Sequence, residues 1–534
     1  RSSGELGAPG MVMLVNPNGV AITPNGVVDA GAFVASTLDI ADADFLSGRY
    51  SFRSGGRSGV VSNQGTVRAG DVALIGAGVV NQGLIEARLG VVAFGAGELV
   101  TLDFAGDGFL SVGIPVSDLG NLTDAAGQPL SALITAEGVI RADGGSILIS
   151  AAGAQALMRQ AINVPGELIA RSVSRDARGR IVLEAHEGAA VLTGSLDAGG
   201  GEHAGGAVHV SGGVVLQGGA INTGGASGGE VTLSSTGDML LAGQISARGH
   251  AGEGGIVSIS AGGAVRENAL SATDASGTTD GGVISLSGVN VLTSGRYSAI
   301  GAAGRGGRID ITGGSLSLLS TQIDASGFVE GGIVRIGGAF QGGRADRTQS
   351  ALYQAFEGRY GALPALASAA QAFVNDGVNI DVSAASGRGG SAVVWSSDLT
   401  TMLGRVNAVG GVVEVSSADT LRTVDLARLS ADSILLDPTN IVIGDFVAAQ
   451  TWAYAGVLAI EAAPIGVADE VGVGVAINAA GDRIAVGAML DDGADNLSPD
   501  SGAVHLFTFA DANFGGAAYV GTIGDSYVGA GNVN

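Results

Sequence analysis

The chain has 534 residues and a net charge of -24; glycine contributes 94 residues, and all 26 basic residues are arginine. The acidity argues against nucleic acid and anionic membranes as partners, and the absence of lysine and cysteine excludes Schiff-base catalysis, P-loop phosphate binding, disulfides and thiolate zinc sites. An apolar content of 46% and only 10 prolines exclude a disordered linker and collagen, and no apolar stretch is long enough for a transmembrane segment.

The N-terminal part of the chain contains a strong turn sequence followed by two similar strand segments. The turn consists of Asn16, Pro17, Asn18 and Gly19. Proline fixes φ, while asparagine and glycine tolerate left-handed conformations, so a tight turn is predicted. The segments VSNQGTV and VVNQGLIEA place Asn63 and Asn81 at matching positions. We expect these two side chains to stack as an inward ladder that bonds turn backbone, rather than to bind a ligand.

A unit of about 25 residues repeats along the middle of the chain. An apolar strand is followed by a small polar turn, a Gly-Gly pair and a second alternating strand. The first glycines of the pairs are Gly205, Gly228, Gly254, Gly281, Gly306 and Gly331. Their spacings are 23, 26, 27, 25 and 25 residues. Alternating strands with this period and no helical periodicity predict an all-β chain folded as a parallel β-helix, a solenoid rod of stacked coils.

The repeat also predicts a register and a length. The second residue after each Gly-Gly pair is apolar, and we assign it to the interior of the rod. These residues are Val231, Val257, Ile284, Ile309 and Val334. Residues 1–428, at roughly 23 residues per coil, predict about 18 coils and a rod of about 90 Å.

Two segments depart from the repeat. Residues 341–375 lose the strand alternation, and we expect a helical or irregular excursion there, cut by Pro364. Residues 429–534 hold 13 acidic residues and only Arg483, so half of the net charge lies in the last fifth of the chain. The predicted organisation is an N-terminal domain over 1–115, β-helix repeats over 116–430, a junction over 431–470 and a small C-terminal β module over 471–534.

The first 115 residues resemble the secretion domain of two-partner-secretion exoproteins, the filamentous-haemagglutinin family of large Gram-negative adhesins. The resemblance is carried by NPNGV at 16–20, FVASTLDIADADFLSGRYSF at 33–52, the two NQG segments and VTLDFAGDGFLSVGI at 100–114. A second stretch, from IDVSAASGRGGSAVVW through VVEVSS to ILLDPTNIVIG, resembles the later β-helix segment of the same family.

This resemblance implies a right-handed parallel β-helix that is exported to the periplasm and then through an outer-membrane transporter with periplasmic recognition domains. It also implies that the NPNG turn belongs to the signal that the transporter reads. The alternative is that the turn is a corner that folds early and caps the rod. Family members have an amphipathic cap and an earlier asparagine-proline motif upstream of this turn, so we expect the N-terminal domain to be incomplete here.

Residues 471–509 resemble one repeat of the FG-GAP or integrin-propeller type. A single blade cannot close a propeller, so we expect the repeat to be truncated or to pack on the rod. Asp491, Asp492 and Asp495, with Asn496, form an acidic loop that offers the oxygen ligands calcium prefers. The regular D-x-D-x-D-G spacing is absent, so an acidic surface turn is the favoured interpretation, and we expect no other cofactor.

A polysaccharide-degrading enzyme is the rival class, because parallel β-helices also carry lyases and glycosidases. Such sites need paired carboxylates on adjacent coils of one face. We expect the acids of the central coils to be scattered: Glu230, Glu253, Asp274, Asp310, Asp324 and Glu330. We expect the histidines to be surface polar residues without ligand spacing: His186, His203, His209, His250 and His505.

These observations favour a secreted, cell-surface adhesin or biofilm matrix exoprotein of a Gram-negative bacterium. We expect its rod to present the excursion and the C-terminal module away from the membrane, without catalysis. Its expected partners are the transporter and a receptor on host cells or glycan surfaces. The alternatives are the stalk of a contact-dependent toxin and a β-helical polysaccharide-degrading enzyme. Adhesion rests on the family resemblance alone.

Overall fold

The structure is a computed structural model of the chain. It describes residues 4–444, apart from 57–58, 88, 103–109, 115–121, 124–128, 154–159 and 344–349, together with residues 471–477, 483–488, 503–508 and 518–524. The chain divides into two compact units, Arg1–Phe446 and Val447–Asn534.

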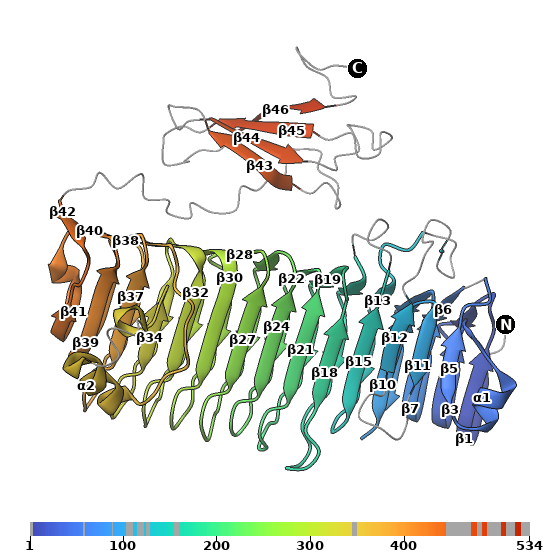
Figure 1. Cartoon of the computed structure of the whole chain (residues 1–534). Helices are drawn as coiled ribbons and strands as arrows, with labels where there is room; N and C mark the ends of the chain where they lie inside the picture. The colour runs from blue at the N-terminus through green and yellow to red at the C-terminus, as the bar shows by residue number, and fades with distance from the viewer. Residues whose placement is uncertain are drawn as a thin grey trace. The chain divides into compact units, whose positions relative to one another are not determined.

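The first unit is a stack of coils, each built from three strands that pair in parallel with the strands of the next coil (Figure 1). One coil consists of β24 (Glu230–Ser235), β25 (Met239–Leu241) and β26 (Gln244–Ser246). The next consists of β27 (Ile256–Ala261), β28 (Ala264–Glu267) and β29 (Ala272–Asp274). Each strand pairs with its counterpart without a register shift. The predicted all-β parallel β-helix is confirmed.

The three kinds of strand form three continuous stacks along the rod. With the strands above, the first stack contains β1 (Glu5–Val15), β3 (Val27–Ser36), β7 (Thr66–Gly76), β10 (Val91–Ala96), β15 (Ser146–Ala151), β18 (Arg180–Glu184), β21 (Ala207–Gly212), β30 (Val283–Thr293), β32 (Arg308–Leu318), β34 (Ile333–Ile336), β37 (Ser391–Ser396), β39 (Arg405–Ser417) and β41 (Leu429–Leu435). The second contains β2 (Val20–Ile22), β6 (Val60–Asn63), β8 (Gly78–Asn81), β13 (Ile134–Ala136), β16 (Ile162–Val164), β19 (Ala189–Leu192), β22 (Val214–Gln217), β35 (Gln371–Val374), β38 (Leu399–Met402), β40 (Thr420–Thr423) and β42 (Asn440–Ile443), and is continued by the second halves of β30 and β32. The third begins with the first halves of β1, β3 and β7 and ends on the first halves of β39 and β41. Between them it contains β9 (Leu84–Ala87), β14 (Val139–Arg141), β17 (Glu167–Ile169), β20 (Ser195–Asp197), β23 (Ala220–Asn222), β31 (Arg296–Ser298), β33 (Gln322–Asp324) and β36 (Asn379–Asp381).

The rod has fewer coils than its length predicts. Within the described residues the first stack holds 15 strands, not the expected 18 or so. At one strand per coil and a spacing of about 4.8 Å, the rod is about 70 Å long. The reason is that several stretches of chain, which form two excursions, leave the coil path and therefore consume residues without adding coils.

The predicted interior register is confirmed. Val231, Val257, Ile284, Ile309 and Val334 are all fully buried. They lie directly above one another, each paired in register with the next. Because the side chains of a strand alternate between its faces, this single column places the alternate residues of the same strands on the outside of the rod.

The first departure from the coil path covers the outer face of the first stack at its N-terminal end. It comprises β4 (Asp39–Ile40), α1 (Asp42–Leu46), β5 (Tyr50–Arg53), β11 (Leu99–Leu102) and β12 (Leu110–Ile114). Its strands form an antiparallel sheet in the order β12-β11-β5-β4. Phe52 and Val100 of this sheet pack on Val34, Ala73 and Ala93, which point outward from the coils and are fully buried. These outward positions are apolar because the sheet covers them.

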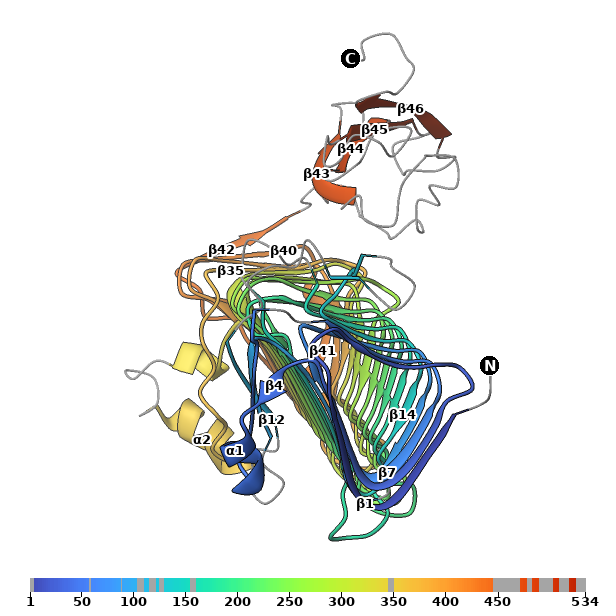
Figure 2. The ribbon, with the colours of Figure 1, turned by 90° about the vertical axis from the view of Figure 1, so that its right-hand side faces the viewer.

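The second departure covers the same face at the other end of the rod. Here η1 (Phe340–Gly343) and α2 (Ala351–Tyr360) leave the coil path, and Ser350 caps α2 by accepting the N–H of Tyr353 at 3.1 Å. The rings of Phe340 and Phe356 stack with centroids 4.1 Å apart and pack with Trp395 of β37. An end-on view places α1 and α2 on the same side of the rod (Figure 2).

The chain returns to the coil path earlier than expected after this second departure. Gln371–Val374 form β35, which pairs in parallel with β32 and β38. Residues 371–374 therefore belong to the rod rather than to the excursion placed at 341–375. The sequence misleads here because β35 is only four residues long, too short for its alternation to stand out.

Between the two covered ends, the outer face of the first stack is polar. In the column that contains Val34 and Ala93, the middle positions are His209, Thr232, Ser258 and Ser285, all partly exposed. At the N-terminal end the apolar residues of this column are covered by the antiparallel sheet, whereas its middle positions face outward without a covering element.

The second unit contains an antiparallel sheet. Its strands are β43 (Val471–Ile477), β44 (Arg483–Ala488), β45 (Ala503–Thr508) and β46 (Ala518–Gly524), in that order. Across the described residues of both units, no helix is long and apolar enough to cross a membrane.

Candidate functional site

The NPNG sequence forms an exposed turn between β1 and β2. The backbone oxygen of Asn16 accepts the N–H of Gly19 at 3.0 Å, and its side-chain oxygen accepts the N–H of Asn18 at 3.2 Å. Gly19 has φ of 127°, a value that strains any other residue. The side chains of Asn16, Pro17 and Asn18 are exposed. The turn is thus rigid in its backbone and open to a partner.

Asn63 and Asn81 lie one coil apart and stack inside the rod. Both are fully buried, and the Nδ2 of Asn63 donates to the Oδ1 of Asn81 at 2.8 Å. The Oδ1 of Asn63 also accepts the N–H of Gly65 at 3.1 Å, and the Nδ2 of Asn81 donates to the backbone oxygen of Gly83 at 3.4 Å. Each amide therefore holds the corner of its own coil while it bonds to the neighbouring one.

A second, outer ladder runs beside this pair. The Nε2 of Gln64 donates to the Oε1 of Gln82 at 2.9 Å, and the Nε2 of Gln82 donates to the Oε2 of Glu137 at 2.9 Å. The repeat alone does not predict this second ladder, although the glutamine that both NQG segments share is a signal for it. Together the two ladders bind three successive coils at the N-terminal end of the rod.

The structure lines up a column of short polar residues where the strands of the third stack end. Its members are Asp197, Asn222, Ser246, Asp274, Ser298, Asp324, Asp381 and Asn407. The aspartates and Asn222 accept a backbone N–H two residues further on: for Asp274, the N–H of Ser276 at 2.8 Å. These Asx turns shape the corner of each coil.

The expectation of scattered acids is therefore wrong for two of the six. Asp274 and Asp324 lie in this one column, two rungs apart. Asp310 is buried instead of solvated, and both of its oxygens accept hydrogen bonds from Arg335, at 2.7 and 2.8 Å. The pairing register between coils determines which acidic residues lie next to each other, and this register cannot be read from the linear sequence.

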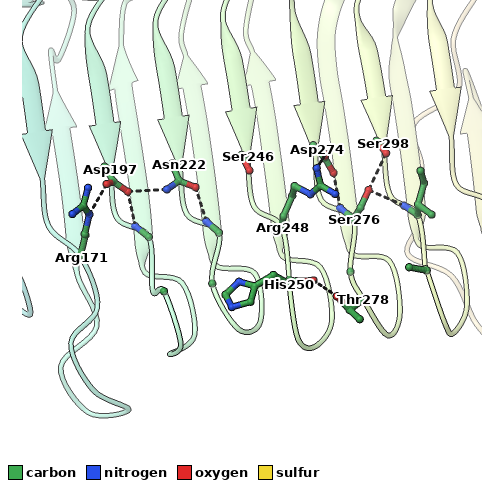
Figure 3. Close-up of a pocket in the computed structure, with 18 residues that line it drawn as sticks. Arg171, Asp197, Asn222, Ser246, Arg248, His250, Asp274, Ser276, Thr278 and Ser298 are labelled. Carbon is green, nitrogen blue, oxygen red and sulfur yellow. Dashed lines mark hydrogen bonds and ion pairs between the residues drawn. The ribbon is translucent and has the colours of Figure 1, made fainter.

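An open groove runs along this corner, with a volume of about 890 Å³ (Figure 3). Five members of the column, from Asp197 to Ser298, line one of its sides. The Nε of Arg171 lies 2.7 Å from Asp197, and this hydrogen bond raises the pKa of the arginine. Arg248 lies 3.3 Å from Asp274.

Two groove side chains remain available to a ligand. Among the described residues, neither the hydroxyl of Ser246 nor the ring of His250 has a hydrogen-bond partner (Figure 3). The side chain of Arg248 is 64% exposed. A guanidinium has five N–H donors, so its ion pair leaves several of them unused.

Asp324 and Asp381 are adjacent rungs of the column, the arrangement that a glycosidase would need. Their Oδ1 atoms, however, accept the backbone N–H groups of Ser326 and Ser383, at 2.9 and 2.8 Å. Both carboxylates thus accept hydrogen bonds that hold the corners of their coils.

The histidines divide into exposed and buried. His186, His203 and His250 are exposed, and His209 is half-buried, so that desolvation lowers its pKa. His505 is fully buried in β45, and the expectation of a surface residue is wrong there. In the described part of the chain, no three His, Asp or Glu side chains gather as a metal site. The calcium candidates Asp491, Asp492 and Asp495 lie outside the described residues.

Two buried carboxyls escaped sequence reasoning. Inside the rod, Glu267 accepts hydrogen bonds from Ser271, Thr293 and Tyr297, while burial raises its pKa. Under the second excursion, burial raises the pKa of Glu414 to about 8. Both residues stand in strands that look ordinary in sequence.

A comparison with protein families finds a similarity in the N-terminal part of the chain. Residues 3–198 match the family described as TPS secretion domain. This part of the chain is thus similar to the secretion domain of two-partner-secretion exoproteins. The match continues past residue 115, through further coils of the rod.

Among solved structures, the crystal structure of the HMW1 secretion domain from Haemophilus influenzae is similar to this chain. The identity is 22%, the coverage is 82% of each chain, and the TM-score is 0.29. The fold itself is shown by the strand pairings described above. No curated protein matches the chain.

Proposed function

We propose that this protein is a cell-surface adhesin or biofilm matrix exoprotein of the filamentous-haemagglutinin kind, passed through an outer-membrane transporter. The observation that carries the proposal is the TPS secretion domain match over residues 3–198. A rod held by parallel ladders suits a stalk that extends a binding surface from the cell.

The NPNG turn is the proposed contact for the transporter. Its three exposed side chains lie just before β2. The last residue of β2, Ile22, pairs with Asn63, so the turn belongs to the coil that stacks on the asparagine and glutamine ladders. A rigid, exposed turn loses little conformational freedom on binding, which favours recognition.

A secretion assay tests this contact. The chain is delivered to the periplasm of a Gram-negative host with an added signal sequence, with or without a two-partner transporter, and the fraction in the medium is measured. We expect secretion only with the transporter, and a several-fold loss for Asn16→Ala. Asn268→Ala is the matched control, because Asn268 also accepts backbone N–H groups in a turn but lies outside the matched range.

Two results would count against the proposal. Equal secretion of both variants would leave the NPNG turn as a structural corner only. Retention of the unaltered chain in the periplasm with every transporter tried would remove the export proposal.

The C-terminal sheet supports an FG-GAP-like repeat, because a propeller blade is a four-stranded antiparallel sheet and β43 to β46 have that order. Adhesion is tested by binding of the purified chain to cells and to immobilised glycans, with products assayed in the same wells. Binding without turnover supports the adhesin. Released reducing ends that disappear in Asp324→Asn would favour the polysaccharide-degrading alternative.

A further inference from the structure

The corner groove is shaped for an extended ligand. It follows five successive rungs, from Asp197 to Ser298, and is open along its length (Figure 3). At about 4.8 Å per rung, these span about 20 Å. A chain lying along the rod axis would meet the same kind of surface at each step, whereas a compact molecule would use only one or two rungs.

The floor of the groove is backbone. Gly225, Gly249 and Gly277 pair in parallel from coil to coil and contribute no side chains. A ligand can therefore approach the peptide groups closely. Because these glycines pair from coil to coil, they recur at the rung spacing.

The walls offer donors and acceptors side by side. Carboxylates at Asp197 and Asp274 accept, Arg248 donates, and Ser246 and His250 have free hydrogen-bonding capacity within the described structure. Hydroxyl groups both donate and accept, so a polyhydroxylated chain can satisfy this mixture. An apolar chain would leave these groups without partners when it displaced water.

The charges in the groove balance. Arg171 is paired with Asp197, and Arg248 is paired with Asp274. A polyanion needs an excess of cations, and it would also approach a chain of net charge -24. A neutral ligand meets neither obstacle.

We propose that this groove binds a neutral, extended glycan along the rod axis, with about one sugar unit per rung. The proposal names a ligand class for the proposed adhesin and in that sense rests on the proposed function. Binding of purified glycan, however, requires neither export nor a cell.

Isothermal titration of the purified chain with cello-, manno- and galacto-oligosaccharides tests the proposal, with oligogalacturonate as the anionic probe. We expect saturable binding of at least one neutral series and about tenfold weaker binding in Arg248→Ala, which loses charge-assisted hydrogen bonds. Arg266→Ala is the matched control: Arg266 is also an exposed arginine paired with an aspartate, Asp238 at 2.8 Å, but it lies outside the groove. The Arg266→Ala variant should bind the neutral oligosaccharide with the same affinity as the unaltered chain.

A second variant fills the groove directly. Ser246 is partly exposed and points from the corner into the groove, so Ser246→Trp should block binding without a change in thermal unfolding (Figure 3). The proposal is overturned if no neutral oligosaccharide binds, if the anionic probe binds better, or if both groove variants bind as the unaltered chain does.

The fates of the two proposals are separable. If cells bind the unaltered chain and both groove variants equally, the groove is not the adhesive site, although the adhesin proposal stands. If oligosaccharides bind and cells do not, the groove proposal stands and the adhesin proposal fails.

Discussion

Val257→Asp tests the register on which the whole rod depends. Val257 is fully buried between Val231 and Ile284 of the adjacent coils. Loss of its burial costs about 2 kcal/mol. A carboxyl in its place must stay protonated at neutral pH, about three units above its usual pKa, which costs about 4 kcal/mol more. The sum, about 6 kcal/mol, is comparable to the whole stability of many domains.

The matched control is Ser258→Asp, one residue further along the same strand. Ser258 faces outward and is partly exposed, so the same new charge should change stability by less than about 0.5 kcal/mol. A turn variant, His250→Asp, should be tolerated as well, because His250 is exposed.

Urea unfolding followed by circular dichroism, with limited proteolysis to map cuts, measures both effects. Since each coil contacts only its neighbours, new cleavage in Val257→Asp should centre on the coils around β27. Equal loss of stability in Val257→Asp and Ser258→Asp would refute the assigned register.

Three further predictions concern the ladders, the corners and a buried acid. Asn81→Ala should lower the free energy of unfolding by about 2 kcal/mol, because it leaves a buried amide unpaired, whereas the exposed Gln82→Ala should change it by less than about 0.5 kcal/mol; equal urea midpoints would contradict the inner ladder. Gly254→Ala should lower the melting temperature, because a Cβ there would overlap a backbone oxygen of the next coil, while Gly358→Ala, in open space on α2, should stabilise that helix by about 1 kcal/mol. Burial raises the pKa of Glu414 from 4.5 to about 8. The contribution of the protonated Glu414 to the free energy of unfolding is therefore complete below about pH 4.5 and is lost as the pH rises through about 8. The change in the free energy of unfolding is on the order of 5 kcal/mol. Glu414→Gln should remove this share of the pH dependence in melts from acid to alkaline pH, and an unaltered slope would count against the buried acid.

The coil architecture could be read from the sequence because the information is local and repeated. Each coil carries the same two-residue alternation and the same Gly-Gly corner, so Val257 can be placed inside from its own segment alone. The NPNG turn follows in the same way from the residues themselves. The stacking of the two NQG segments can be predicted because the motif recurs at the matching place in the next coil.

The candidate groove could not be read in this way. Its column joins residues from successive coils, and the number of residues between them varies from coil to coil. A shift of one residue in the register would place the side chain of Asp274 on the opposite face of its strand from that of Asn222. The partners in buried hydrogen bonds are even further apart in the sequence: Gln341 donates its N–H to Glu414, 73 residues further on.

Composition and period therefore decide that this chain is an acidic, cysteine-free parallel β-helix, because backbone pairing and alternation are properties of short segments. The tertiary structure decides the rest: that the described residues form 15 strands in the first stack, that two excursions cover the ends of one face, and that polar side chains align into a groove. Stacking register and covering elements create those features, and both join residues that the sequence keeps apart.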